Sequence, residues 1–392
     1  MLSRLGRPVA SAATAVAAAA TRRHGIMVRN KGGFRMMTAT TTTGSLQTET
    51  LPTTSIPVVR SVQAIRQWRS QRTSPSIGLV PTMGALHDGH LALIRAAARE
   101  NDEVVVSVFL NPAQFGAGED LASYPVTWET DAKALARTDQ QLSREADARG
   151  RISVVFAPDT HTMYPEGRAG QQNPSSTDDG TFVTLNPLSR RLEGASRPTF
   201  FRGVATICTK LFNLVRPTRV YLGQKDVQQT VVVRRMVRDL MIPLDVVVCP
   251  TQRDPDGLAL SSRNVYLGPR RRAVAVKLLP CALAAARRAY ERDLRKARSD
   301  ILAAADVVVA NLDLAQRALS PRQRALFELD YLSLADPDTL DEVDIVDDAK
   351  GAVLSAAVKM LPLEDVCEGE DVGYAGGPVV RLIDNVILRP TA

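Results

Sequence analysis

Cysteine is scarce in this chain of 392 residues, and its placement excludes a cysteine-based metal site. The four cysteines lie far apart and show none of the short spacings that are typical of zinc ligands. We expect them to be reduced and partly buried, and we assign them no function. They are Cys208, Cys249, Cys281 and Cys367.

Long apolar runs are also missing. No stretch approaches the ~20 apolar residues that a membrane-spanning helix needs, and the alanine-rich segment Ala10–Ala20 is too short and too weakly apolar. Hydrophobic residues make up 45% of the chain and charged residues 23%, as in an ordinary soluble globular protein. We therefore expect no membrane partner, and the length allows two domains, each with its own core.

Acidic residues are nearly absent from the first 50 positions. This segment holds seven lysines or arginines and a single acid, Glu49, so it carries +6 of the formal net charge of +7. The rest of the chain carries only +1. The basic overall charge therefore gives little support to nucleic-acid binding.

The same N-terminal segment has the composition of an organellar import sequence. It is rich in Arg, Ala, Ser and Thr, and it leads into the Thr-rich linker Met37–Thr54. We expect residues 1–54 to be a presequence and disordered linker, and the protein to be mitochondrial. The alternative is a cytoplasmic protein whose tail carries no address or whose translation starts at Met36 or Met37. We do not expect a secretory signal, because no compact apolar segment follows the basic start.

Apolar segments that resemble strands alternate with helical segments between residues 55 and 268. This alternation predicts an α/β fold with a doubly wound parallel sheet. Ligands bind such sheets beyond the carboxyl ends of the strands. The expected strands are Ile77–Pro81, Glu103–Leu110, Ile152–Ala157, Arg219–Leu222 and Leu244–Cys249. The expected helices are Leu91–Ala98, Thr127–Ala148, Thr206–Val215 and Val227–Leu240.

The pattern changes near Pro269, which predicts a second, smaller α+β domain over residues 269–392. A long helical stretch, Arg270–Asp313, comes first. Three short strands are expected after it, at Leu329–Leu334, Val379–Ile383 and Val386–Leu388. Two polar segments are expected to be loops: Gly167–Gly180, as a mobile insertion, and the acidic, glycine-rich Glu364–Gly377.

The segment Pro81–His90, PTMGALHDGH, joins an expected buried strand to an expected helix. A helix N-terminus presents unpaired N–H groups and the positive end of a dipole, so it attracts phosphate. Gly84 and Gly89 would let the backbone approach a ligand, and His87 and His90 would add imidazole donors. On this tetrad alone, a histidine pair that merely caps the helix is an equally good interpretation.

Two later segments also carry residues suited to a nucleotide. In Asp256–Asn264, DGLALSSRN, two hydroxyls precede Arg263, whose guanidinium suits the outer phosphates. Alone, Ser-Ser-Arg is more often a helix cap. In Gly223–Asp226, GQKD, Lys225 could meet a phosphate, and Asp226 could meet a ribose hydroxyl or support a metal. The alternative there is a merely solvated turn.

An HxGH turn followed by a Ser-Ser-Arg loop resembles the nucleotidylyl-transferase superfamily. Within it, seven segments in order resemble the pantothenate synthetase (pantoate–β-alanine ligase) family, over about Pro57–Leu388. Three of these segments come directly after expected strands, which favours one shared site. The seven are Pro81–His90, Asn111–Phe115 (NPAQF), Glu119–Pro125 (EDLASYP), Arg197–Gly203 (RPTFFRG), Gly223–Gln229 (GQKDVQQ), Asp256–Asn264 and Arg381–Asn385 (RLIDN).

The resemblance implies a Rossmann-like catalytic domain of the HIGH type, a smaller C-terminal lid domain, a homodimer and small-molecule substrates. It also implies a reaction in which pantoate and MgATP give pantoyl adenylate and pyrophosphate. β-Alanine then displaces AMP to give pantothenate. Histidines, a lysine, an arginine and a helix N-terminus would neutralise the charge that builds on the phosphates. Mg²⁺ would enter with ATP, since no direct metal motif is present.

Carried over by position, the resemblance also implies residue roles. His90, His87, Lys225 and Arg263 would be catalytic, with His90 as a phosphate-stabilising donor. Gln114 and Gln229 would bind pantoate, Gln114 would also border the β-alanine site, and Asn111 would line the same pocket. The expected ATP-binding residues are Met83, Gly84, Ala85, Leu86, His87, Asp88, Gly89, His90, Gly223, Gln224, Lys225, Asp226, Gln252, Leu260, Ser261, Ser262 and Arg263.

Three positions depart from the pattern of the family. Phe200 stands where the family usually has histidine, Gln224 where bacterial members commonly have glutamate, and Val126 where arginine is common. None of them belongs to the HxGH tetrad, the Ser-Ser-Arg loop or the glutamines assigned to pantoate. We therefore expect an active enzyme.

Two alternative functions remain open at this point. Another adenylyl-transferring enzyme would share the HxGH and Ser-Ser-Arg features, although Gln114 and the Gln228-Gln229 pair argue against it. An inactive paralogue that acts as a binding protein would explain Phe200 and Gln224. Turnover with pantoate and β-alanine would exclude both alternatives.

Overall fold

The computed structural model describes residues 49–166, 180–292 and 296–390. These residues belong to one compact unit, Thr48–Ala392. Residues 1–48 of the expected presequence and linker, and residues 167–179 of the expected insertion, lie outside the described residues. The last part of the predicted disordered linker is wrong, because Leu51 is buried in the core and Thr50 forms a β-bridge with Pro57. The domain boundary expected at residue 269 falls inside this unit and stays a prediction.

The larger sheet has six parallel strands in the order β1-β4-β3-β2-β5-β6. Its inner strands are rich in valine and nearly fully buried, as expected when helices cover both faces. The chain runs outward from β2 through β3 to β4 and then returns to β5 on the other side of β2. The topological switch point therefore lies between β2 and β5. The strands are β1 Val58–Val59, β2 Ile77–Thr82, β3 Glu103–Val108, β4 Arg151–Phe156, β5 Arg219–Gly223 and β6 Asp245–Cys249.

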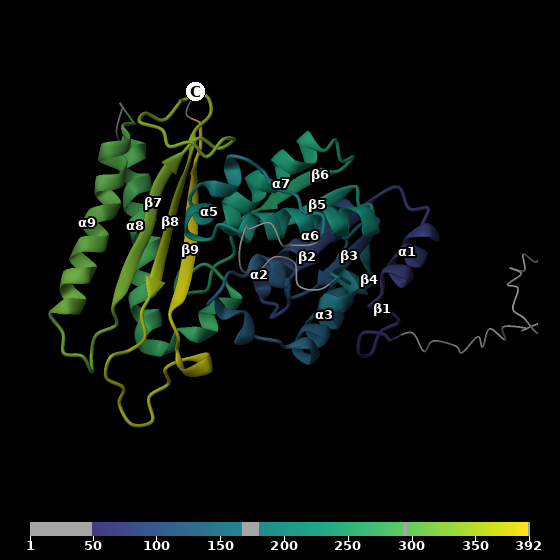
Figure 1. Ribbon diagram of the computed structural model, residues 1–392, viewed down its shortest axis with the longest axis horizontal. Coiled ribbons are helices and arrows are strands. Elements are labelled where there is room, and N and C mark those ends of the chain that lie inside the picture. The colour runs from purple at the N-terminus through teal and green to yellow at the C-terminus, as the bar shows by residue number, and fades with distance from the viewer. Residues whose placement is uncertain (1–48, 167–179, 293–295, 391–392) are drawn as a thin grey trace, which may run out of the picture. The chain divides into compact units, whose positions relative to one another are not determined.

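Helices pack on both faces of this sheet and make a three-layer α/β/α arrangement (Figure 1). One face is covered by α2 (Asp88–Glu100) and α3 (Trp128–Leu142). The other is covered by α1 (Val62–Ser70), α6 (Phe200–Val215) and α7 (Val227–Asp239). Two single-turn helices, α4 (Thr160–Met163) and α5 (Glu193–Ser196), lie in the connection between β4 and α6.

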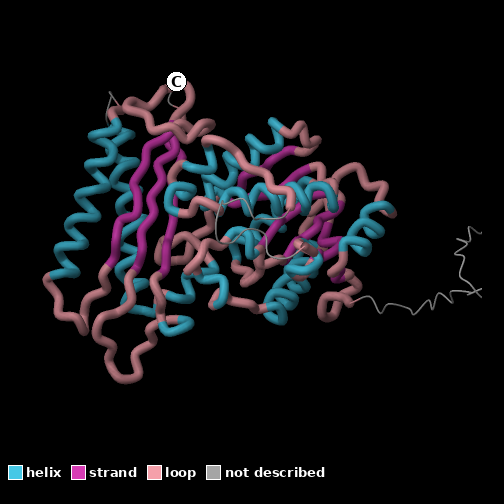
Figure 2. The backbone as a smooth tube through the Cα atoms, in the orientation of Figure 1, coloured by secondary structure: helices cyan, strands magenta, loops and turns pink. Residues whose placement is uncertain are grey.

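The smaller sheet has three antiparallel strands in the order β7-β8-β9. The long helices α8 and α9 pack on one of its faces, against residues such as Leu354 and Val358. Figure 2 shows these three strands beside the two helices, with the parallel sheet on the other side. The alternate positions, including Ser355 and Lys359, line a cavity. The elements are α8 Gly268–Arg292, α9 Arg298–Arg317, β7 Phe327–Ala335, β8 Ala352–Met360 and β9 Val380–Leu388.

The predicted fold class is confirmed, and so are all five predicted strands of the parallel sheet, with boundaries that differ by a few residues. Strand β1 and helix α1 were not predicted. No helix among the described residues is long and apolar enough to cross a membrane.

The prediction is less accurate for the C-terminal elements. The expected helix Arg270–Asp313 is two helices, and the two strands expected after Pro378 are the single strand β9. Strand β8 was missed entirely, because AVLSAAVKM is alanine-rich and buried on both faces, so it shows no alternation of polar and apolar residues.

Candidate active site

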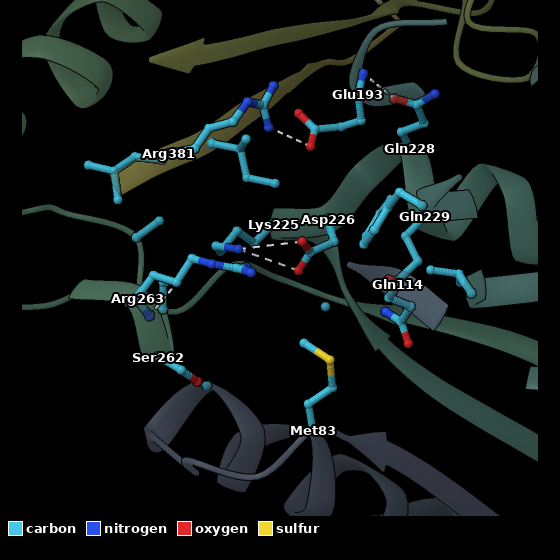
Figure 3. A pocket seen from close by; sticks show the side chains of 18 of the residues that line it. Met83, Gln114, Glu193, Lys225, Asp226, Gln228, Gln229, Ser262, Arg263 and Arg381 are labelled. Atoms are coloured by element: carbon cyan, nitrogen blue, oxygen red, sulfur yellow. Dashed lines mark hydrogen bonds and ion pairs between the residues drawn. The ribbon is translucent and has the colours of Figure 1, made fainter. Parts of the chain in front are cut away.

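A cavity of about 640 Å³ opens at the carboxyl ends of β2 and β5, at the switch point of the parallel sheet. Its walls come from the segments that follow β2, β3, β5 and β6, from α5, and from the free face of the small sheet. Figure 3 shows Lys225 and Asp226 near the centre of this cavity, with Met83 pointing into it. Twelve of the seventeen expected ATP-binding residues line it: Met83, His87, Gly89, His90, Gly223, Lys225, Asp226, Gln252, Leu260, Ser261, Ser262 and Arg263.

The two histidines are held by backbone N–H groups at the start of α2. His87 is the N-cap residue, and the Gly89 N–H donates to its Nδ1 at 3.1 Å. The His87 N–H in turn donates to Nδ1 of His90 at 3.4 Å. Since both Nδ1 atoms accept, each neutral ring carries its proton on Nε2. A Cβ on Gly89 would lie 2.8 Å from the His87 ring, so this close packing requires glycine.

Burial keeps both rings neutral. Burial and, second to it, the neighbouring Lys225 ammonium lower the pKa of His87 to about 4, against opposing carboxylates. Burial also lowers the pKa of His90 well below its usual value, with His87 and Lys225 as additional causes. Each ring is therefore an uncharged N–H donor at neutral pH. The capping interpretation of this turn is confirmed, and the phosphate-binding interpretation stays a prediction.

The first half of the turn is fixed by a carboxylate that the sequence did not reveal. Asp131, which is 2% exposed on α3, accepts the N–H groups of Ala85 and Leu86 at 2.9 Å each. Gly84 adopts a positive φ of 85° to make this bend. The cavity lining does not include Gly84, Ala85, Leu86 or Asp88, which were expected to bind ATP. Residues 84–86 shape the turn instead.

The Ser-Ser-Arg loop reaches the cavity through a 3₁₀ helix, Ser262–Tyr266. Ser261 is its N-cap and accepts the Arg263 N–H at 3.3 Å, as the capping alternative required. The Ser262 hydroxyl donates to the Ala85 carbonyl at 2.9 Å, so it joins this loop to the histidine turn.

Three arginines line the cavity, and each is paired with carboxylates: Arg197, Arg263 and, on β9, Arg381. Arg263 makes a two-pronged ion pair with Asp120, with both N–O distances at 2.8 Å. Burial alone would lower the pKa of Arg263, but the Asp120 carboxylate more than offsets it and raises that pKa. Arg197 pairs with Glu119 at 2.5 and 2.8 Å and also donates to the Gln114 carbonyl at 3.0 Å.

At position 200, where the resemblance led us to expect a histidine, the Phe200 ring is covered by Arg197. The Arg197 guanidinium lies 3.9 Å from the ring centroid of Phe200. A cation over the face of a ring is attracted by the ring's quadrupole. Phe200 therefore provides a stacking surface at this position in place of a polar group.

Lys225 and Asp226 lie together on the turn after β5. The Lys225 ammonium is 3.4 Å from the Asp226 carboxylate, and both line the cavity. Gln224 points elsewhere: its amide donates to Asn385 Oδ1 on β9 at 3.3 Å, and it is not part of the lining. A glutamate at position 224 would place its carboxylate near the side-chain amide of Asn385.

Four amide residues, Asn111, Gln114, Gln228 and Gln229, line this part of the cavity. Figure 3 shows the three glutamines. The Gln229 side chain lines the cavity and has no hydrogen-bond partner among the described residues. Gln114 also lines it and accepts a hydrogen bond from Asn111 Nδ2 at 2.8 Å. Asn111 is 1% exposed and also bonds Tyr164 and the Gly203 carbonyl, so it positions Gln114. Gln228 anchors the backbone around α5.

The residues that sequence reasoning left without a role share one property: each acts through a long-range contact. Some lay within recognised segments, where an acid or arginine in the motif was the available signal. Asp131 lay in no motif. They are Glu119, Asp120, Asp131, Glu193, Arg197, Arg381, Asp384 and Asn385.

Comparison with known proteins gives one consistent result. A profile of the pantoate-beta-alanine ligase family matches residues 57–387. A pantothenate synthetase from Roseiflexus castenholzii is 42% identical over 311 residues, which cover 79% of this chain and 99% of that protein. A pantothenate synthetase from Chloroflexus aurantiacus is 43% identical over 334 residues, which cover 85% of this chain and 98% of the relative.

Solved structures agree with the sequences. The pantothenate synthetase of Thermus thermophilus is 38% identical with a TM-score of 0.65, over 85% of this chain and 99% of that one. The pantoate-beta-alanine ligase of Francisella tularensis, solved with beta-gamma ATP and beta-alanine, is 26% identical with a TM-score of 0.58, over 85% and 98%. The similarity spans both sheets and stops short of the N-terminal segment.

Proposed function

The chain belongs to the pantoate–β-alanine ligase family, and we propose which of its residues carry out the reaction of that family. The enzyme condenses pantoate with β-alanine in an ATP-dependent reaction that makes pantothenate. Both steps of this reaction are assigned to the cavity at the switch point.

The first step joins pantoate to AMP. A carboxylate oxygen of pantoate attacks the α-phosphorus of ATP, the bond from that phosphorus to the bridging oxygen breaks, and pyrophosphate leaves. His87 and His90 donate Nε2–H bonds to phosphate oxygens, and Lys225 supplies a positive charge. Since both rings are neutral, they stabilise charge rather than transfer protons.

The second step replaces AMP with an amine. The β-alanine nitrogen attacks the acyl carbon of pantoyl adenylate, a C–N bond forms, the C–O bond to AMP breaks, and the surplus nitrogen proton leaves to solvent. Gln114 and Gln229 hold the pantoyl group, and Asn111 keeps the Gln114 amide in place. The cavity contributes mainly by positioning the two reactants.

One observation supports these assignments most strongly. All seven motif segments, spread from residue 81 to residue 385, contribute residues to the lining of one cavity. The test is production of AMP and pantothenate by purified protein that starts at Met37, with MgATP, pantoate and β-alanine. Turnover that needs both organic substrates is expected. ATP–pyrophosphate exchange only with another acid would favour a different adenylyltransferase. ATP binding without any turnover would favour a non-catalytic paralogue.

Mg²⁺ is proposed to enter with ATP rather than to occupy a protein cage. Among the described residues, no group of three or more His, Cys, Asp or Glu side chains could hold a metal ion. Asp226 and Asp120 are acids paired with two of the proposed phosphate-binding residues, and one or two carboxylates plus phosphates suit Mg²⁺. When bound, the ion would neutralise charge on the phosphates. Turnover with ATP should vanish in EDTA and return with Mg²⁺.

The small sheet with α8 and α9 is proposed to act as a lid domain over residues 269–392. Its free face already supplies Tyr331, Arg381 and Asn385 to the cavity lining. Small-angle scattering with and without a non-hydrolysable ATP analogue would test this, since closure should reduce the radius of gyration. An unchanged profile on saturation would contradict a moving lid.

A homodimer and mitochondrial import are the last two proposals. The dimer rests on membership of the family, and light scattering should give twice the 42.5 kDa chain mass. Import rests on the acid-poor, Arg-rich composition of residues 1–50. Residues 1–54 fused to a fluorescent protein should direct it to mitochondria. A cytoplasmic signal from that fusion would favour the alternative.

A further inference from the structure

The segment Arg381–Asn385 on β9 contacts the turn that carries Lys225. Nδ2 of Asn385 donates to the carbonyls of Gln224 and Lys225, at 2.9 Å each, and its Oδ1 accepts from the Gln224 amide at 3.3 Å. Asn385 is 2% exposed, so these bonds are made without competition from water. One side chain therefore fixes two successive peptide groups next to the Lys225 ammonium.

The preceding residue holds the second loop of the same site. Both carboxylate oxygens of Asp384 accept from Arg253, at 2.6 and 2.9 Å, and Asp384 Oδ1 also accepts the Asn385 N–H at 2.8 Å. Arg253 also donates to the Gly257 carbonyl at 3.1 Å, in the loop that leads to Ser261. The Asn385 backbone is thus held by a part-buried ion pair beside it.

We propose that Asn385 is a positioning residue for the phosphate-binding lysine. Its two bonds to the carbonyls of residues 224 and 225 set the path of the backbone at Lys225, and with it the direction in which the ammonium enters the cavity. The proposal rests on the ATP-binding part of the proposed function. It gives the RLIDN segment of the small sheet a role in nucleotide binding, although Asn385 is 160 positions from Lys225.

Equilibrium binding separates positioning from general support of the fold. The probes are β,γ-methylene ATP and adenosine, measured by calorimetry on the whole chain with Mg²⁺. Asn385→Ala should weaken binding of the triphosphate about tenfold and binding of adenosine less than about twofold, because only the phosphate contact depends on Lys225. Asn385→Asp, which keeps the shape but turns a carboxylate toward two carbonyls, should weaken the triphosphate at least as much. Equal weakening of both probes, or of neither, would overturn the proposal.

A double variant and a matched control sharpen the test. In a Lys225→Ala background, Asn385→Ala should add less than about twofold to the loss of triphosphate binding. A further tenfold loss there would show that Asn385 acts independently of Lys225. Ser333→Ala removes a buried hydroxyl without a partner among the described residues, from the same row of the small sheet, and should leave both affinities unchanged.

The same experiment distinguishes this inference from the reaction. If the wild-type chain binds the analogue and Asn385→Ala shows the expected selectivity, positioning by Asn385 stands even if no pantothenate forms. If pantothenate forms while Asn385→Ala binds the analogue normally, the reaction stands and the positioning role is wrong. No binding of the analogue by the wild type would overturn both.

Discussion

The histidine turn and the arginine pairs face the same cavity but are built in opposite ways. His87 and His90 are held by N–H groups no more than three positions away, and both rings are uncharged. Arg263 and Arg197 are held by carboxylates 143 and 78 positions away. A phosphate bound as proposed would find the imidazole N–H donors available, whereas it would compete with acids for the arginines. Local backbone geometry thus gives ready donors, and long-range ion pairs give donors that must exchange partners.

The largest effect is expected at the histidine turn. His90→Ala should lower kcat at least ~10²-fold, the loss typical of a missing donor to a charged transition state. Steady-state turnover with all substrates saturating would measure it. Near-normal turnover would reject the role of His90 in stabilising phosphate, and the histidine turn would no longer count as a group of phosphate donors.

The next effect should fall on the acid substrate alone, because Gln114 belongs to neither group of phosphate donors. Gln114→Ala should raise KM for pantoate about tenfold or more, through one or two lost hydrogen bonds, and should change KM for ATP far less. Initial rates with each substrate varied in turn would show the split. Parallel changes in both constants would count against the contact.

The neutral state of the histidines predicts a pH dependence of stability. Because the folded pKa of His87 is about 4 and the unfolded value about 6.5, the unfolded chain binds more protons in this window. The contribution of the neutral His87 ring to the free energy of unfolding is therefore fully present above about pH 6.5 and is lost as pH falls towards 4. His87→Asn keeps an N-cap acceptor but removes this titration.

Thermal unfolding from pH 8 to pH 5 would measure the effect. The wild type should lose on the order of 1 kcal/mol more than His87→Asn between pH 6.5 and 5.5, by the usual value of one pKa unit. Identical pH profiles for the two proteins would show that the His87 ring is not held neutral.

The smallest effect is expected at the arginine pairs. Asp120→Asn should lower KM for ATP about threefold, because it removes the carboxylate that competes with phosphate for Arg263. A part-buried ion pair of this exposure contributes on the order of 1 kcal/mol. Asp239→Asn, which breaks an exposed pair with Arg235 on α7, is the matched control. A higher KM in Asp120→Asn would mean that Asp120 holds Arg263 in its binding position instead of blocking it.

The sequence predicted those parts of the site that depend on neighbours in the chain. The strand before Pro81, the helix after it and the HxGH tetrad are contiguous, so the strand-to-helix turn that lines the cavity could be predicted directly. Gln114, Lys225 and Ser261–Arg263 followed from motifs of the family, and all line the cavity. The cap alternatives for His87 and Ser261 were also right.

The partners of these residues could not be predicted in the same way. Three of these partners are Asp131 on α3, Asp120 in the segment after β3, and Asn385 on β9. Nothing in their local sequence indicates which distant atom they contact. Strand β8 was missed for a related reason, since its alanine-rich run is explained only by the helices and cavity on its two faces. A boundary between domains at residue 269 remains a prediction.

The sequence by itself determined the alternation of strands and helices, the histidine donors and the family to which the chain belongs. These depend on periodicity, turn chemistry and ordered motifs, which are local properties of the chain. Only the tertiary structure decided that the histidines are neutral, that the arginines are paired, and that the small sheet contacts the Lys225 turn. Burial and long-range hydrogen bonds cause all three, and both exist only once distant segments have packed together.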